Sequence, residues 1–407
     1  MLKQRKVGLV LLALCALAFS APARVLTGAD LLVEKRMDLV AGKRVALVTN
    51  HTGRLSNGEF LLNALLKKGV RVVRLFGPEH GIRGAAGAGE AVVDTIDTET
   101  GIPVVSLYGK TQKPTPAMLA DVDVMVYDIQ DVGARFYTYI STMKLCMEAS
   151  AENGVEFLVL DRPNPLGGLK VDGPVLEDSL KSFVGMLPIP VVYGLTCGEL
   201  AEMINGERWL ANGIRAKLTV VRMEGWNRSM LWEDTGLTWV PPSPNIPFPG
   251  SALAYPSTCY LEGTNLSEGR GTSRPFETVG APFLDGVRLS SSLNALKLKG
   301  VRISPTSFTP EASKFKGEPC QGVLLEVADP AAFEPLRTAL SLFKTLNSLS
   351  PGDFMINRPG FVRLMGSSQV YEMLLRGESV DKMIRSWDER AKAFGRKSRA
   401  YRVYAAN

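Results

Sequence analysis

The sequence is poor in residues that bind metals. Its 407 residues include two histidines, His51 and His80, and five cysteines, and they contain no C-x-x-C pair and no Cys/His cluster. Zinc sites need three or four such ligands close together. We therefore expect no metal centre, and a metal-dependent deacetylase or amidase is disfavoured.

Long apolar runs are absent beyond the N-terminus. At the N-terminus, a basic segment at 3–6 precedes an apolar stretch at 7–19, and small residues at 21–23 match an A-x-A cleavage site. The apolar stretch is short for a membrane span. We predict that residues 1–23 are a secretory signal and that the mature protein is secreted, in the periplasm, without a stable membrane span. An uncleaved anchor is the alternative.

Dense blocks of positive charge are also absent. The formal net charge is +6, from 47 Lys and Arg against 41 Asp and Glu, and three of the positive charges lie in the N-terminal segment. The remainder is too small to indicate a nucleic-acid partner. No G-x-G-x-x-G, P-loop or G-x-S-x-G motif occurs. We therefore expect neither a nucleotide cofactor nor a hydrolase nucleophile elbow.

The cysteines that follow the predicted signal are widely spaced. They are Cys146, Cys197, Cys259 and Cys320. In an oxidising compartment they could form two disulfides. Buried free thiols are equally compatible with the apolar helical sequence around Cys146 and Cys197.

The first half of the chain alternates strand and helix patterns. Short apolar runs predict strands at 44–50, 70–76, 103–107, 122–129 and 155–160. Helical patterns occupy 60–68 and 139–153, and a capping box at Thr196-x-x-Glu199 opens another helix. Strands that are apolar on both faces and separated by helices indicate a parallel, doubly wound sheet of the α/β class.

A proline-rich stretch at 240–249 separates this half from the rest. Proline at this density cannot continue a helix or a central strand. We place a domain boundary near residue 250, which gives domains at 24–250 and 251–407. The second domain shows helical patterns near 330–348, 368–376 and 380–395 and strands near 300–304 and 321–327. It is predicted to be a smaller α/β or α+β unit.

Polar residues collect where the predicted strands end. The four ends carry Asn50-His51, Glu79-His80, Asp128-Ile-Gln-Asp131 and Asp161-Arg162-Pro-Asn164. Ligands of open parallel sheets bind beyond the carboxyl ends of the strands. The coincidence predicts one shared site, although each residue alone could belong to a turn or a cap.

The candidate chemistry is that of carboxylates. Glycoside hydrolysis needs an acid that protonates the leaving oxygen. Glu79 could be that acid, tuned by His80, or it could instead pair with Arg83. Asp128 and Asp131 are candidate second carboxylates, or caps of the next helix.

Three further segments could complete such a site. Arg135, Tyr137 and Tyr139 suit a sugar with an anionic group, or could be a helix start packed on the core. The segment 262–272 is dense in glycine and hydrogen-bonding groups and could face the site or be a surface turn. The glycine-rich stretch 84–89 is predicted to be a flexible loop over the site.

Six motifs in order resemble the NamZ-type exo-β-N-acetylmuramidases, a family long known only as a domain of unknown function. They are VTNHTGR, FGPEHGIRG, YDIQDVGARFYTYI, LDRPNPLGG, PPSPNIP and EGTNLSEGRGT. The resemblance runs from about residue 30 to the C-terminus. It implies a Rossmann-like parallel sheet, a smaller C-terminal domain, and an active site in the cleft between the two domains.

The resemblance also implies an activity. Members of this family release N-acetylmuramic acid from the non-reducing ends of peptidoglycan glycan fragments, without a cofactor. Glu79 is the residue carried over as catalytic. The second catalytic group stays open, because assistance by the acetamido group of the sugar would leave Asp128 or His80 an orienting role. The alternative is a non-catalytic peptidoglycan- or muropeptide-binding protein on the same scaffold.

The lactyl carboxylate of N-acetylmuramic acid needs a cation, and Arg135, Arg162 and Arg270 are the candidates. The predicted substrate-binding residues are Asn50, His51, Asp131, Arg135, Tyr137, Tyr139, Arg162, Asn164, Asn245, Glu262, Asn265 and Arg270.

Overall fold

The computed structural model describes residues 24–84, 87, 90 and 93–407. The predicted signal at 1–23 lies outside the described residues, and so does most of the predicted loop at 84–89. Within the described ranges, no helix is both long and apolar enough to cross a membrane.

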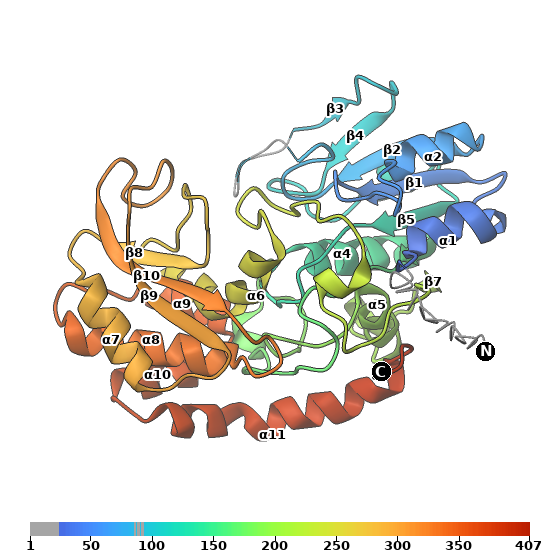
Figure 1. The fold of residues 1–407 in the computed structure, drawn as a ribbon. Coiled ribbons are helices and arrows are strands. Elements are labelled where there is room, and N and C mark those ends of the chain that lie inside the picture. The colour runs from blue at the N-terminus through green and yellow to red at the C-terminus, as the bar shows by residue number, and fades with distance from the viewer. Residues whose placement is uncertain (1–23, 85–86, 88–89, 91–92) are drawn as a thin grey trace, which may run out of the picture.

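The larger sheet has seven strands in the order β3-β4-β2-β1-β5-β6-β7 (Figure 1). The strands are β1 (Arg44–Thr49), β2 (Arg71–Gly77), β3 (Thr95–Ile96), β4 (Pro103–Ser106), β5 (Val124–Asp128), β6 (Glu156–Leu160) and β7 (Lys217–Val221). All neighbours pair in parallel except β3 and β4, which are antiparallel at one edge. The predicted α/β class with a Rossmann-like parallel sheet is confirmed.

Helices cover both faces of this sheet. Val45 and Leu47 of β1 pack in one apolar cluster with α1 (Gly28–Lys35) and α2 (Leu61–Lys67). Ala46 and Val48 pack in another cluster with α4 (Tyr139–Glu152) and α5 (Cys197–Gly206). Successive side chains of a strand point to opposite faces, so a central strand must be apolar throughout. That is why the short apolar runs predicted these strands correctly.

Local signals set the helix ends. The Thr196 side chain accepts a hydrogen bond from the backbone N–H of Glu199, and the Glu199 carboxylate accepts one from the backbone N–H of Thr196. The predicted capping box is therefore present. A short helix, α3 (Pro116–Leu119), precedes β5.

The smaller sheet lies beyond residue 250. Its strands β8 (Thr278–Ala281), β9 (Val301–Phe308) and β10 (Cys320–Val327) are antiparallel in the order β8-β10-β9. Its helices are α6 (Pro249–Thr258), α7 (Gly286–Ala295), α8 (Pro335–Leu349), α9 (Arg358–Met365), α10 (Ser368–Leu375) and α11 (Val380–Ser398). An antiparallel sheet packed on helices makes this part α+β, one of the two predicted forms.

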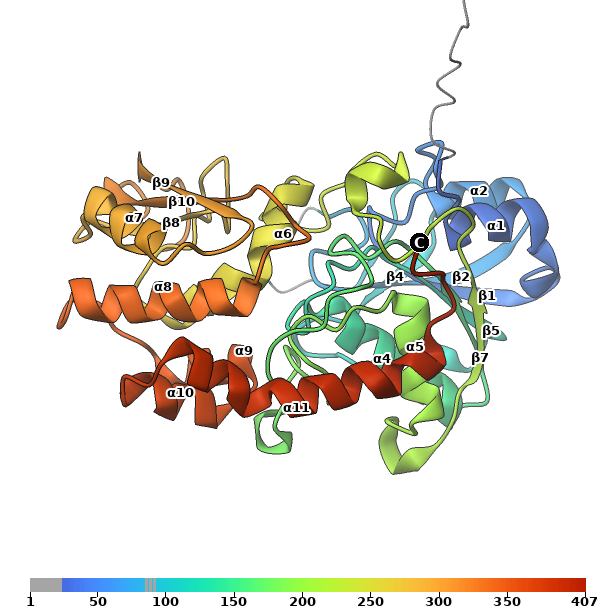
Figure 2. The same cartoon turned by 60° about the horizontal axis from the view of Figure 1, so that its bottom comes forward.

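The long helix α11 returns the chain to the larger sheet (Figure 2). At its end, Lys397 is ion-paired with Glu207 at 2.5 Å, and the Tyr404 hydroxyl donates to Asp161 at 2.6 Å. The two sheets are therefore tied together at the C-terminus as well as through α6.

The cysteines of the described chain are buried and free. Of the two alternatives left open by the sequence, the structure shows free thiols at Cys146, Cys197, Cys259 and Cys320.

Candidate active site

A cavity of about 1510 Å³ lies between the carboxyl edge of the larger sheet and the second part of the chain. From the sheet side it is lined by residues that follow β2, β4 and β5, among them Glu79, Tyr108 and Thr138. From the other side it is lined by the proline-rich stretch at 243–246 and by the segment at 262–276. A cleft in this position is what the family resemblance implies.

Glu79 reaches the cavity through a tight turn after β2. The backbone N–H of Gly81 donates to the Pro78 carbonyl at 2.9 Å. His80 has φ 71° and Gly81 has φ 73°, so two successive residues are left-handed. For a non-glycine residue this conformation costs about 1–2 kcal/mol. The fold accepts that cost at a residue that is buried and lines the cavity.

Hydroxyl-bearing side chains from two other strand ends lie near the Glu79 carboxylate. The Thr138 hydroxyl, which follows β5, donates to Glu79 Oε2 at 2.9 Å. Tyr108, which follows β4, lines the same cavity. Desolvation, and then the charge of Glu79, raise the pKa of Tyr108 to about 12. Thr138 therefore orients the carboxylate, and Tyr108 stays protonated at neutral pH.

Charged residues of both signs form the opposite wall. Arg270 is ion-paired with Glu262 at 2.7 Å and with Glu268 at 3.1 Å. Its guanidinium also lies 5.1 Å from the centroid of the Phe276 ring. Lys314 reaches the second oxygen of Glu268 at 3.1 Å. Two carboxylates and two cations thus balance, and the guanidinium is fixed in place.

Glu262 is a second acid of this wall. A third of its side chain (33%) is exposed, and the rest is buried by the surrounding residues. This desolvation raises the pKa of Glu262, Arg270 opposes the shift, and Glu268 reinforces it. Glu262 therefore takes up a proton more readily than an exposed glutamate.

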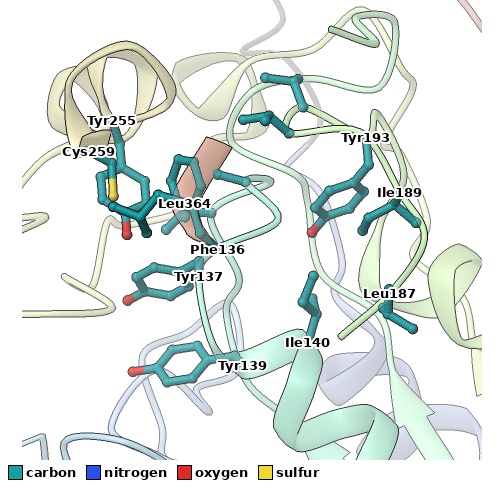
Figure 3. Packing of buried hydrophobic residues seen from close by; sticks show 14 of the residues in the cluster. Phe136, Tyr137, Tyr139, Ile140, Leu187, Ile189, Tyr193, Tyr255, Cys259 and Leu364 are labelled. Atoms are coloured by element: carbon teal, nitrogen blue, oxygen red, sulfur yellow. The ribbon is translucent and has the colours of Figure 1, made fainter. Parts of the chain in front are cut away.

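Aromatic rings form the floor beside Thr138. The Tyr137 ring lies edge-on to the rings of Tyr139 and Tyr255, with centroid distances of 4.8 and 6.0 Å (Figure 3). The Tyr137 hydroxyl is buried and has no partner among the described residues. Tyr137 lines the cavity, but its hydroxyl has no exposed surface there.

Six of the predicted site residues line this cavity. They are Glu79, His80, Tyr137, Asn245, Glu262 and Arg270.

Asp128 and Arg162 lie elsewhere and bind each other. Asp128 is fully buried and accepts from Arg162 Nε at 2.6 Å and from Nη2 at 2.9 Å. The predicted catalytic role of Asp128 is corrected accordingly, because its carboxylate is occupied and outside the cavity. Arg162 is likewise not placed to bind a ligand in this cavity.

Arg135 is a structural residue of the interior. It is 1% exposed, and its guanidinium donates to the carbonyls of Pro174, Ile189, Leu364 and Met365. Its predicted role in binding an anionic sugar is therefore wrong, and it packs on the core. Of the three arginines considered for the lactyl carboxylate, Arg270 is the one that lines the cavity.

Two residues that were predicted to bind substrate instead form hydrogen bonds that hold the wall of the cavity. The His51 ring meets the Pro241 carbonyl at 2.6 Å through Nε2, and the Tyr139 hydroxyl donates to the Pro242 carbonyl at 2.7 Å. Asn50 is fully buried and binds Thr52.

The remaining predicted residues are held by other parts of the chain. Asp131 accepts from the Tyr193 hydroxyl and from the Gly133 N–H. Asn164 binds the Leu195 carbonyl and the Leu166 N–H, and Asn265 binds the backbone of Asp353 and Met355.

The structure also settles the roles of Arg83, of the N-terminus of α4 and of the segment 262–272. Arg83 is ion-paired with Asp97 at 2.8 Å and with Glu99 at 3.0 Å. Helix α4 has Thr138 at its N-cap, so neither Asp128 nor Asp131 caps it. The segment 262–272 supplies cavity residues and is not a plain surface turn.

Several cavity residues were not predicted from the sequence. Thr138 and Glu268 lie inside two of the six motifs, and their polar side chains were the available signal. Tyr108 follows a predicted strand and could have been included by the same rule. Lys314 had no signal, because it lies between β9 and β10 and reaches the site through the fold.

Comparisons with known proteins identify the family to which this chain belongs. The family described as exo-beta-N-acetylmuramidase NamZ matches with its N-terminal part at residues 45–249 and its C-terminal part at 253–404. The peptidoglycan beta-N-acetylmuramidase NamZ of Bacillus subtilis (strain 168) is 46% identical over 383 residues, which cover 94% of this chain and 92% of that protein.

Solved structures are similar over the same length. Two DUF1343 family proteins from Bacteroides fragilis NCTC 9343 match with TM-scores of 0.88 and 0.78 and identities of 41% and 34%. In both cases the match covers 94% of this chain and 99% of the other.

Proposed function

The chain belongs to the exo-β-N-acetylmuramidase NamZ family, and we propose that it hydrolyses peptidoglycan glycan fragments with Glu79 as the acid. It is a glycoside hydrolase that releases N-acetylmuramic acid from the non-reducing end. The observation that carries the assignment of Glu79 is its position in the cavity, where the hydroxyl of Thr138 orients the carboxylate.

In this proposal the acid form of Glu79 gives its proton to the glycosidic oxygen as the bond to the anomeric carbon breaks. The Thr138 hydroxyl holds the carboxyl in place. Positive charge develops at the anomeric carbon, and the carboxylates of Glu262 and Glu268 line the same cavity. A water molecule, either directly or after the acetamido oxygen of the sugar has bonded to that carbon, completes the hydrolysis, and its proton returns to Glu79. His80 is buried beside Glu79 and holds the turn that presents it.

We assign Arg270 to the lactyl carboxylate of the substrate. Its Nε and Nη2 are engaged by Glu268 and Glu262, which leaves Nη1 without a described partner. A fixed guanidinium with a free donor can form a charge-assisted hydrogen bond with a carboxylate. N-acetylglucosamine lacks that group, so this contact would favour N-acetylmuramic acid. Asn245, which lines the same cavity, would bind a hydroxyl or acetamido group.

We also propose that the protein is exported. In a Gram-negative host it would be exported to the periplasm, where peptidoglycan is made and broken down. The basic, apolar and small-residue pattern of residues 1–23 supports this. N-terminal sequencing of the protein from the host's periplasmic fraction tests it. A chain that begins after residue 23 is expected, and a chain that keeps residue 1 in the cytoplasm would contradict it.

The activity is tested with the disaccharide N-acetylmuramyl-β-1,4-N-acetylglucosamine. The wild type should release N-acetylmuramic acid, and Glu79→Gln should lose turnover by about 100-fold or more, since general acid catalysis contributes about 10²–10⁴-fold. Glu90→Gln is the matched control, because Glu90 lines the same cavity but is bonded to the Gly87 N–H. Wild-type protein that binds the disaccharide without cleaving it would instead indicate a peptidoglycan-binding protein.

A further inference from the structure

A second cavity of about 500 Å³ lies at the carboxyl edge of the larger sheet. Its lining residues follow three neighbouring strands: Thr52 and Arg54 follow β1, Gln130 follows β5, and Arg162 follows β6. From β1, the next strand in the chain, β2, lies on one side of the sheet, and the later strands β5 and β6 lie on the other side. The strand order therefore reverses between β1 and β5, beside this cavity. Parallel sheets bind ligands at this switch point, and the volume suits a small molecule.

The cavity is positively charged. Arg24, Arg54 and Arg162 line it, and none of the described residues that line it carries a carboxylate. The buried Asp128 behind Arg162 neutralises one of these charges. The remaining positive charge favours an anionic ligand.

Arg54 and Arg162 are each fixed by hydrogen bonds, and each keeps one guanidinium nitrogen without a partner among the described residues. Arg162 uses Nε and Nη2 for Asp128 and for the Arg54 carbonyl, and Arg54 uses Nε and Nη1 for the carbonyls of His51 and Gly58. Arg162 Nη1 and Arg54 Nη2 make no hydrogen bond to a described residue. Guanidinium groups fixed by a carboxylate and by carbonyls lose little further entropy when they bind an anion.

Two lining residues carry buried polar atoms that lack partners among the residues described. These atoms are the Trp232 indole nitrogen, which is a donor, and Gln130 Oε1, which is an acceptor. Trp232 is 7% exposed and Gln130 is 3% exposed. A buried polar atom without a partner costs about 1–3 kcal/mol, so two beside one cavity need an explanation. Leu237 and Val240 supply an apolar wall.

We propose that this second cavity binds a small organic acid, whose carboxylate pairs with Arg54 and Arg162 beside the polar side chains of Trp232 and Gln130. The carbon skeleton would lie against Leu237 and Val240. This site is separate from the catalytic cavity, since the two share no lining residue. The proposal therefore does not depend on the proposed function.

The test is a calorimetric titration of the purified protein with two acids. Mandelate carries a carboxylate, a hydroxyl and an apolar ring, and N-acetylmuramic acid is the acid that the proposed reaction releases. Benzyl alcohol and N-acetylglucosamine are the matched neutral compounds. We expect at least one acid to bind with a dissociation constant of about 1 mM or below, and its neutral match to bind about tenfold more weakly.

Variants locate the binding. Arg54→Gln should weaken it about tenfold. Arg270→Gln alters the catalytic cavity and should leave this binding event unchanged. Arg54→Gln should still cleave the disaccharide at the wild-type rate. If neither acid binds the wild type, or if Arg54→Gln binds as the wild type does, the proposal is wrong.

Discussion

Replacement of Asp128 by asparagine separates a structural role of this residue from a catalytic one. The substitution keeps the shape of the side chain and removes its charge. Asp128 is fully buried, and Arg162 is 6% exposed. The variant therefore leaves the Arg162 guanidinium without a counter-ion in the protein interior. We expect a large loss of stability and little change in the chemistry.

The size of the loss follows from the geometry. Two charge-assisted hydrogen bonds of 2.6 and 2.9 Å join the pair. Removal of one partner from such a buried pair costs about 3–5 kcal/mol. For a domain of about 150–250 residues, 1 kcal/mol corresponds to about 2–4 °C, so the midpoint of thermal unfolding should fall by about 6–20 °C.

The assay combines thermal unfolding with kinetics well below the midpoint. Asp128→Asn should show the lower midpoint and near wild-type turnover per folded molecule. The matched control is Glu224→Gln, which removes an exposed ion pair with Lys35 and should cost at most about 1 kcal/mol. An Asp128→Asn protein with unchanged stability and lost turnover would refute the structural role and restore the catalytic one.

Three further predictions concern the catalytic cavity and its support. Arg270→Gln should lower turnover of the N-acetylmuramyl disaccharide about 10- to 100-fold. Turnover of diacetylchitobiose, which has no lactyl group, should stay nearly unchanged. Equal losses on the two substrates would contradict the assignment of Arg270. Thr138→Val should reduce kcat with little change in KM, because the Thr138 hydroxyl binds Glu79 and does not cap α4. Thr138→Ser keeps the hydroxyl and should restore kcat. A wild-type kcat in Thr138→Val would show that Thr138 has no role in the mechanism. Burial raises the pKa of Asp131 from 3.8 to about 6, so the folded state binds this proton more tightly than the unfolded state, and stability is lost as pH rises from about 4 to 6. Asp131→Asn cannot lose that proton, so urea unfolding should show it gaining up to about 3 kcal/mol relative to wild type between pH 4 and pH 7, and a difference independent of pH would contradict the shift.

Burial on both faces made the central strands predictable. Every position from Val124 to Asp128 is buried. A strand with apolar side chains on both faces is stable only where both faces are covered. The edge strand β7 was not predicted, because its Lys217 and Thr219 are exposed and only part of it is apolar. Glu79 was predictable for a related reason, since the ends of parallel strands meet at one edge.

Arg135 shows why the rest of the site was not predictable. Its Nη1 and Nη2 donate to carbonyls that lie from 39 to 230 residues away in the sequence, and its Nε is buried without a partner among the described residues. No local pattern reveals such partners, and an arginine next to tyrosines has the same sequence whether it binds a ligand or four carbonyls. The same holds for Lys314, which meets Glu268 from a distant loop.

The proline-rich stretch explains why the polar strand ends serve two cavities and not one. Val240 lines the second cavity, whereas Ser243 to Ile246 line the first. The prolines between them have fixed φ angles, and two side chains hold their carbonyls, His51 on Pro241 and Tyr139 on Pro242.

His51 can hold this wall because it stays neutral. Desolvation is the largest effect on its pKa and lowers it, and the contact of Nε2 with a carbonyl requires the proton on that nitrogen. Nδ1 is then a buried acceptor without a described partner. A side chain at Gly84 would collide with this ring, because a Cβ there would lie 2.3 Å from Nδ1. Two residues that looked like ligands in the sequence, His51 and Tyr139, therefore support the partition between the two cavities.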